Sequence, residues 1–367
     1  MKNFRDLPTP SLVLDLERFE ANLEKMSRFV AERGVALRPH AKTHKCVQIG
    51  RRQVAQGAIG ICVATIAEAE VLSGAGIGGL LITSELVGEP KVSRFINVLK
   101  SKPDTMLVVD NAENVAHLQD SLRQAGLYAS VLIDLDVGQN RTGVKPGKPA
   151  HALAVTVDRS PNLRLEGICA YAGHLAHVKG FDNRRQASRA AIQQALETRE
   201  SLRRDGHHVP ILTGGSTGTY NIDSEMEDIT EIQPGSYVFM DVEYRRIGGS
   251  AGDVYEDFAP ALCVLATVVH SSPGKAIVDA GLKAFATDRP FGPEPLSLKG
   301  VKYEFAGDEH GRLIIESPSE PIRLGDKHRF IIPHTDPTVN LYGRIHCIRG
   351  EEVVDVWPIM ERAGGYF

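Results

Sequence analysis

Between residues 35 and 233 the chain repeats one pattern, in which a short apolar run is followed by a segment with helical spacing of its apolar residues. Short apolar runs of this kind favour strands, and the spacing of the intervening segments favours amphipathic helices. The apolar runs are 35–37, 59–63, 80–83, 106–110, 131–135, 165–171, 211–213 and 231–233, and the clearest helical segments are 66–75, 112–125 and 184–204. Strands of continuous apolar character that alternate with helices indicate a parallel sheet with both faces covered.

This alternation predicts an α/β fold, namely a (β/α)8 TIM-type barrel, because the number of strand–helix units equals the number that closes such a barrel. An open, doubly wound sheet is the alternative. That alternative lacks support from a dinucleotide-binding signature, since no Gly-x-Gly-x-x-Gly motif follows an early strand.

Near residue 245 the pattern changes. Residues 248–252 form a glycine-rich segment typical of a linker, and the chain beyond it alternates apolar and polar residues between frequent turns. The strand-like runs there are 261–270, 275–279, 301–305, 313–316, 328–332, 343–349 and 353–358. We therefore predict two domains, a barrel over residues 16–245 and a β domain made of residues 1–15 with 246–367.

Charge and cysteine content exclude several classes of protein. A formal net charge of -4 offers no basic surface for nucleic acid. The odd number of cysteines, 5 in all and none in a Cys-x-x-Cys pair, argues against a disulfide framework or a zinc finger. The N-terminus lacks the apolar core of a signal peptide, and no run of about 18 apolar residues could span a membrane. These features predict a cytoplasmic protein without a membrane or nucleic-acid partner.

In a barrel of this kind the active site lies in the loops that follow the strands. Lys42 follows the first predicted strand, in a segment that also contains four basic residues, Arg38, His40, His44 and Lys45. Neighbouring cations disfavour the ammonium form of a lysine and free its amine to attack a carbonyl. Lys42 is therefore a candidate for a covalent cofactor anchor, with a solvated basic loop as the alternative.

A glycine- and hydroxyl-rich segment follows the seventh predicted strand. Backbone N–H groups and short hydroxyls at such a position suit a phosphate, although glycines there can also serve only a tight turn. The candidate phosphate ligands are Gly215, Ser216, Thr217, Gly218 and Thr219. Together with an anchoring lysine, a phosphate site suggests an aldehyde cofactor with a phosphate handle, which is pyridoxal 5'-phosphate.

The loops after the fifth and sixth predicted strands supply further candidates. Arg141 could lie near the cofactor ring and bias its electronics through a permanent positive charge, or it could be a surface arginine in a glycine turn. His174 and His177 are candidates for acid–base catalysis because an imidazole titrates near neutral pH, the alternative being ordinary hydrogen-bonded loop residues. Tyr171, which opens the same loop, is a candidate cofactor contact.

One further pair of residues suggests a metal. His334 and Asp336 are separated by a single residue, so on an extended backbone both side chains project to the same face. An imidazole and a carboxylate together suit Mn2+, Mg2+ or Zn2+, with the remaining positions open to water or substrate. The alternative is a hydrogen-bonded turn.

Seven segments, in order along the chain between Thr9 and about Gly365, together resemble the D-threonine aldolases. That family belongs with the D-serine dehydratases to the alanine-racemase-like, fold type III class of pyridoxal phosphate enzymes. The segments are 38–45, 136–143, 213–218, 235–241, 278–283, 308–311 and 334–340.

The resemblance implies a homodimer with the active site between subunits and a pyridoxal phosphate Schiff base at Lys42. It also implies a cofactor contact from Arg141, a phosphate site over residues 215–219, and metal ligation by His334 and Asp336. His177 matches the histidine that acts as base on the substrate hydroxyl in the aldolases. Tyr237, which lies in one of the matching segments, is predicted to contact the cofactor.

The resemblance favours a metal-assisted lyase that cleaves D-3-hydroxy amino acids of the D-threonine type to glycine and an aldehyde, with Mn2+ preferred. The alternative is a dehydratase that converts the same substrates to an oxo acid and ammonia. A racemase and a non-enzymatic pyridoxal phosphate carrier are the remaining alternatives. This sequence has Ala172 where the aldolases carry a histidine, which is a difference from the aldolases. It has Asp336 where the dehydratases usually carry a cysteine, which is a difference from the dehydratases.

Overall fold

The computed structural model describes residues 2–360 and divides the chain into two compact units. The barrel unit contains Met26–Lys42 and Val47–Gly235, and the β unit contains Met1–Lys25, Thr43–Cys46 and Ser236–Phe367. Residues 361–367, the end of the predicted β domain, lie outside the described residues. The division falls inside helix α1 and after residue 235, whereas the sequence pattern places it at residues 15 and 245. A continuous helical period cannot reveal where the packing partners of a helix change.

The barrel unit is built on eight parallel strands in the order β3-β10-β9-β8-β7-β6-β5-β4. An isolated parallel bridge between His40 and Cys62 joins the two ends of this order, so the sheet closes on itself. This closure confirms the predicted (β/α)8 barrel and excludes the open sheet. The strands are β3 (Ala36–Leu37), β4 (Cys62–Val63), β5 (Leu81–Ile82), β6 (Met106–Val109), β7 (Ala129–Asp134), β8 (Leu163–Ala170), β9 (Ile211–Gly214) and β10 (Glu231–Ile232).

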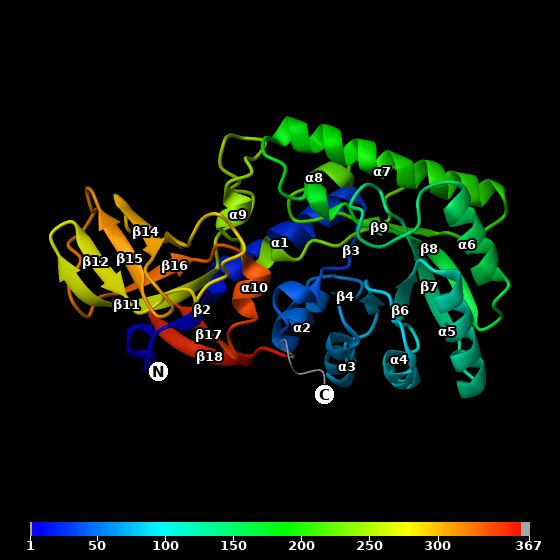
Figure 1. Ribbon diagram of the computed structural model, residues 1–367, viewed down its shortest axis with the longest axis horizontal. Coiled ribbons are helices and arrows are strands. Elements are labelled where there is room, and N and C mark those ends of the chain that lie inside the picture. The colour runs from blue at the N-terminus through cyan, green and yellow to red at the C-terminus, as the bar shows by residue number, and fades with distance from the viewer. Residues whose placement is uncertain (1, 361–367) are drawn as a thin grey trace. The chain divides into compact units, whose positions relative to one another are not determined.

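Helices follow the strands as the sequence pattern predicts, and in Figure 1 α3 to α7 surround the parallel strands. Local signals define their ends. Asn111 caps α5 by accepting hydrogen bonds from the N–H groups of Glu113 and Asn114, and Gly126 ends it in the left-handed conformation. The helices are α1 (Leu16–Arg33), α2 (Val47–Ala55), α3 (Ile66–Gly74), α4 (Glu89–Ser101), α5 (Ala112–Ala125), α6 (Lys148–Asp158), α7 (Phe181–Arg204) and α8 (Tyr220–Asp223). Within residues 2–360 none of the helices is both long and apolar enough to cross a bilayer.

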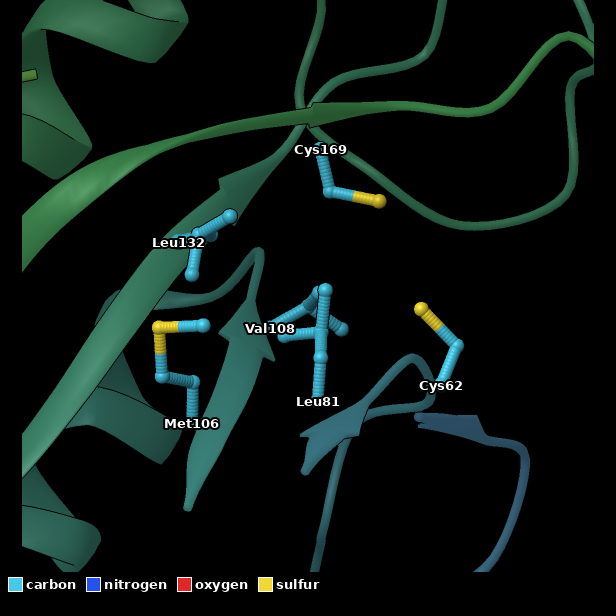
Figure 2. Close-up of a cluster of buried hydrophobic side chains, with 6 residues drawn as sticks. All are labelled: Cys62, Leu81, Met106, Val108, Leu132 and Cys169. Carbon is cyan, nitrogen blue, oxygen red and sulfur yellow. The ribbon is translucent and has the colours of Figure 1, made fainter. Parts of the chain in front are cut away.

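Side chains from five neighbouring strands meet inside the barrel (Figure 2). The cluster explains why these strands are apolar along their whole length: one face meets the barrel interior and the other meets the helices. Its members are Cys62, Leu81, Met106, Val108, Leu132 and Cys169. Burial raises the pKa of both thiols in the cluster, so they serve as small apolar side chains rather than as nucleophiles.

The β unit contains a mainly antiparallel sheet that includes the N-terminal strand. Strand β2 pairs antiparallel with β11 and parallel with β17, which is why a segment from the start of the chain belongs with the C-terminal strands. The strands are β1 (Lys2–Asn3), β2 (Ser11–Asp15), β11 (Leu262–Ser272), β12 (Lys275–Val278), β13 (Glu294–Pro295), β14 (Val301–Phe305), β15 (Gly311–Ile315), β16 (Lys327–Ile331), β17 (Arg344–Arg349) and β18 (Glu352–Pro358). Two short helices, α9 (Val242–Arg245) and α10 (Thr335–Val339), complete the unit.

Candidate active site

Lys42 lies in a 3-10 turn, Ala41–Thr43, just beyond the C-terminal end of the first barrel strand, and its side chain is half-buried. The backbone N–H of Lys42 donates to Nδ1 of His40 at 3.3 Å. The other ring nitrogen of His40 lies 3.0 Å from the hydroxyl of Thr83, which follows the third barrel strand. The turn that carries Lys42 is therefore linked through His40 to the end of β5.

One of the cations predicted to crowd this lysine is paired with a carboxylate. Arg38 is buried and forms an ion pair with Glu231 at 2.8 Å, which neutralises its charge. In His40 and His44 the Nδ1 atom accepts a backbone N–H, from Lys42 and Cys46 respectively. The ammonium of Lys45 donates to the side-chain oxygen of Asn340 at 3.3 Å. The position at a strand end supports this lysine as the candidate anchor, and its crowding by the other basic residues stays a prediction.

The loop after β9 has the shape expected of a phosphate cradle. A Cβ atom on Gly214 would lie only 2.5 Å from the carbonyl oxygen of Ala170, and Gly215 has a φ of +77°, so both positions require glycine. The side chains of Ser216, Thr217 and Thr219 that follow are almost fully buried. The loop therefore presents hydroxyl groups and close backbone in an enclosed place, which fits a phosphate group.

The carboxylate of Asp223 accepts a hydrogen bond from this loop. The hydroxyl of Thr219 accepts a hydrogen bond from the N–H of Ser216 at 3.0 Å and donates to Asp223 at 2.6 Å. The hydroxyl of Ser188, on α7, donates to the other oxygen of the carboxylate at 2.5 Å. Burial raises the pKa of Asp223 to about 6, although both hydroxyls favour the ionised form.

Arg184 connects two loops: residues 215–219, called the phosphate-type loop below, and the loop that carries His177. Its Nε donates to the carbonyl oxygen of Gly218 at 2.7 Å, and its Nη1 donates to that of Val178 at 2.8 Å. The side chain is fully buried, so its positive charge acts on the loop without screening by water. Sequence reasoning missed Arg184, although it shares one face of α7 with the buried residues Ser188 and Ala191 at helical spacing.

The loop that carries Arg141 folds back on its own strand. Its base is closed by a bridge between Leu135 and Val144. Asp136 accepts hydrogen bonds from the N–H groups of Gly138 and Asn140 and from the ammonium of Lys145. Burial alone would raise the pKa of Asp136, but these donors lower it to about 2.

Two further carboxylates hold the tip of this loop. The hydroxyl of Thr142 donates to Asp134 at 2.8 Å, and the N–H of Gly143 donates to Asp110 at 3.1 Å. Asp110 directly follows β6, and Asp134 ends β7. Arg141 is thus flanked in the chain by Asn140 and Thr142, whose hydrogen bonds to Asp136 and Asp134 hold the loop.

Contacts between neighbouring loops bring three of the predicted residues together. The guanidinium of Arg141 lies 5.9 Å from the ring centre of Tyr171. The ring of His174 packs over Gly138, where a Cβ atom would come within 3.3 Å of Nε2. His177 is half-buried in the same loop as His174, which is exposed. Lys42, Arg141, both histidines and the phosphate-type loop all follow barrel strands, as predicted.

An acidic group that sequence reasoning missed lies at the same end of the barrel. Burial raises the pKa of Glu85 to about 7, and repulsion from Asp134 and Asp110 acts in the same direction. Burial also raises the pKa of Asp134. The available signal was that each of these acids ends or closely follows a buried strand.

The predicted metal pair lies in the β unit, and its backbone differs from the expectation. His334 is extended, with φ of −145°, but Asp336 belongs to the first turn of α10, so the prediction of an extended segment is wrong. The cause is Asp241, whose carboxylate accepts hydrogen bonds from both the N–H and the hydroxyl of Thr335 at 2.9 and 2.7 Å. This cap starts a helix where the sequence pattern suggests a strand end.

Both members of the pair make contacts compatible with a metal site. Nδ1 of His334 lies 2.7 Å from Asp288, so Nε2 is the nitrogen that could face a metal. Asp336 accepts a hydrogen bond at 3.0 Å from the hydroxyl of Thr43, the residue after Lys42 in the chain. Over residues 2–360 no set of three or more His, Cys, Asp or Glu side chains is grouped as metal ligands. A metal held by the pair would need other ligands.

Tyr237 is in the β unit, where its buried ring packs edge-on against Phe258 with ring centres 5.6 Å apart. Its cofactor contact stays a prediction.

The fold and the barrel loops define a class of enzyme. Residues 14–243 match the alanine racemase N-terminal domain, and residues 261–348 match a putative serine dehydratase domain. The chain is therefore an alanine-racemase-like, fold type III pyridoxal phosphate enzyme.

Similar proteins narrow the class to a family. The chain is 38% identical to a D-threonine aldolase of Arthrobacter sp, with 96% of this chain and 92% of that protein covered. It is 33% identical to a 3-hydroxy-D-aspartate aldolase of Paracoccus denitrificans, with 98% and 94% covered. The crystal structure of D-threonine aldolase from Filomicrobium marinum superimposes with a TM-score of 0.93 at 36% identity, with 98% and 97% covered. The chain belongs to the D-threonine aldolase family and is a lyase.

Proposed function

We propose that this lyase cleaves D-3-hydroxy amino acids of the D-threonine type to glycine and an aldehyde by a retro-aldol reaction, with pyridoxal 5'-phosphate at Lys42 and a divalent metal at His334 and Asp336. The observation that carries the proposal is the hydrogen bond from Thr43 to Asp336. It ties the carboxylate of the metal pair to the residue that follows the cofactor anchor in the chain.

Residues of the barrel unit would hold the cofactor. Its aldehyde would be bound by Nζ of Lys42, its phosphate by the loop of residues 215–219, and its ring would lie near Arg141. The fit rests on the glycine-dependent loop backbone and on the buried guanidinium of Arg184 behind it. When bound, the cofactor supplies an electron sink for the electrons released as the bond between Cα and Cβ breaks.

A second group of residues would act on the 3-hydroxyl of the substrate. His334 and Asp336 would hold a divalent ion, Mn2+ in preference to Mg2+ or Zn2+, that binds and acidifies the 3-hydroxyl. His177 would accept the hydroxyl proton as the bond breaks. A general base contributes about 10²–10⁴-fold to a rate, so His177→Ala should lose activity by that factor while it retains the cofactor. His174 is the second acid–base candidate.

A dehydratase is the second candidate function, favoured by the match of residues 261–348 to a putative serine dehydratase domain. In that reaction Lys42 would remove the α-proton, and hydroxide would leave with help from the metal. The products would be an oxo acid and ammonia instead of glycine and an aldehyde.

The two functions are separated by product analysis. The purified protein, loaded with pyridoxal phosphate and Mn2+, is incubated with D-threonine, D-serine and D-3-hydroxyaspartate, and every product is identified. Glycine with acetaldehyde from D-threonine supports the aldolase. Ammonia with 2-oxobutanoate from the same substrate contradicts it and supports the dehydratase. Lys42→Ala serves as the inactive control.

We also propose that the protein is a cytoplasmic homodimer. Support for the compartment comes from the five cysteines, which are buried and form no disulfide bond among the described residues. Light scattering during gel filtration should give twice the mass of 40.0 kDa of one chain.

A further inference from the structure

His334 is one corner of a closed ring of charged side chains in the β unit. Nδ1 of His334 lies 2.7 Å from Oδ2 of Asp288. Arg289 lies 2.9 Å from the same oxygen and 2.6 Å from Oε1 of Glu243. The ring is completed by Nε2 of His334, which lies 3.9 Å from Oε2 of Glu243.

The contact with Asp288 determines which nitrogen of His334 carries a proton. A carboxylate can only accept a hydrogen bond, so Nδ1 must donate. In the neutral ring the proton is then on Nδ1, and the lone pair is on Nε2. A carboxylate in this relation to a histidine fixes the tautomer and orientation of the ring and increases its basicity as a metal ligand.

The neighbouring charges act in the same direction. Arg289 holds Asp288 from a second side, which limits the directions in which its carboxylate can turn. Within the ring, the two carboxylates and one guanidinium beside a neutral His334 sum to one negative charge. Such an environment favours a cation beside the ring.

We propose that Asp288 is a positioning residue for the metal: it holds the proton of His334 on Nδ1 and thereby presents Nε2 to the divalent ion. This inference rests on the metal site of the proposed function. It adds Asp288, which no sequence motif indicated, to the residues on which metal affinity depends.

The test is the affinity for Mn2+ of the protein loaded with pyridoxal phosphate, in the absence of substrate, measured from the electron paramagnetic resonance signal of free Mn2+. Loss of such an outer carboxylate typically weakens metal binding about 10–100-fold. Asp288→Ala should show a loss in that range. Asp288→Asn should lose less, because its amide oxygen can still accept from Nδ1.

The chain offers a matched control in the barrel unit. Nδ1 of His207 lies 2.6 Å from Asp158, a pair of the same chemistry. Asp158→Asn should leave the affinity for Mn2+ unchanged. His334→Ala should abolish specific binding.

The outcomes separate this inference from the proposed function. If His334→Ala loses the metal but Asp288→Ala binds it within twofold of the unaltered protein, the role of Asp288 is wrong and the metal site stands. If His334→Ala binds Mn2+ as tightly as the unaltered protein, both the metal site and the role of Asp288 are wrong.

A second measurement distinguishes positioning from a merely structural role. In metal-free protein labelled with ¹⁵N-histidine, at a pH where imidazoles are neutral, the signals of His334 should show the proton on Nδ1. Asp288→Ala should shift the population toward the tautomer with the proton on Nε2, while His207 stays unchanged. A proton on Nε2 of His334 in the unaltered protein overturns the inference.

Discussion

Replacement of Asp223 by asparagine should make the barrel more stable at neutral pH. This carboxyl is fully buried beneath the phosphate-type loop, and burial raises its pKa from 3.8 to about 6. The folded state therefore binds the proton more tightly than the unfolded state does. Stability from this group is fully present below pH 4 and is lost as the pH rises through 6.

The size of the effect follows from the change in pKa. A change of one unit corresponds to about 1.4 kcal/mol, so the rise from 3.8 to about 6 corresponds to ~3 kcal/mol. An asparagine cannot ionise, and its amide can still bond to the hydroxyls of Ser188 and Thr219. The free energy of unfolding of Asp223→Asn, relative to the unaltered protein, should thus be greater by about 3 kcal/mol at pH 7 than at pH 4.

Urea unfolding of cofactor-free protein between pH 4 and pH 7 measures this difference. Circular dichroism at 222 nm follows the barrel unit, which contains most of the helices, and the single tryptophan, Trp357, follows the β unit. Ser188→Ala is the paired variant: it removes a donor that favours the ionised form, so it should lose more stability than the unaltered protein as the pH rises. Parallel pH profiles for Asp223→Asn and the unaltered protein would refute the reasoning.

Three other substitutions test the cofactor anchor and the barrel. Lys42→Ala should abolish the yellow absorbance of the cofactor-loaded protein and the borohydride-stable label found by mass spectrometry; an unaltered protein without a label at Lys42 contradicts the anchor. Gly214→Ala should lower both the melting temperature and the affinity for pyridoxal phosphate, because its Cβ would lie 2.5 Å from a carbonyl oxygen. Gly74→Ala, with no atom within 4 Å of its Cβ, is the control. Arg38→Met should cost about 3–5 kcal/mol of unfolding free energy by stranding Glu231, and the double substitution Arg38→Met with Glu231→Leu should recover most of it in the same urea assay.

The sequence predicted the barrel and the loops of its active end with few errors. Parallel strands end at the same face, so the order of strands along the chain already places Lys42, Arg141 and the glycine loop at that face. Apolar runs and helical spacing arise from burial, which each segment records in its own residues. Such features require no knowledge of the contacts between distant segments.

Contacts between distant segments account for what sequence reasoning missed. The extended backbone predicted from His334 to Asp336 is replaced after His334 by a helix, because Asp241, far away in the chain, accepts the N–H of Thr335. Arg38, one of the cations expected to crowd Lys42, instead pairs with Glu231 of the adjacent strand β10. Both outcomes depend on which atoms come within about 3 Å of each other in the folded chain, which residue spacing does not specify.

The sequence alone determined the kind of fold, the family and the positions of the candidate anchor, phosphate loop and metal pair. Each of these can be recognised from a local residue pattern or from a motif. Only the tertiary structure decided which acids are buried enough to change their pKa, which hydroxyls and guanidinium groups support the loops, and which nitrogen of His334 lies beside Asp288. Burial and hydrogen-bond geometry are properties of the folded neighbourhood, and they act on residues that carry no signature of their own.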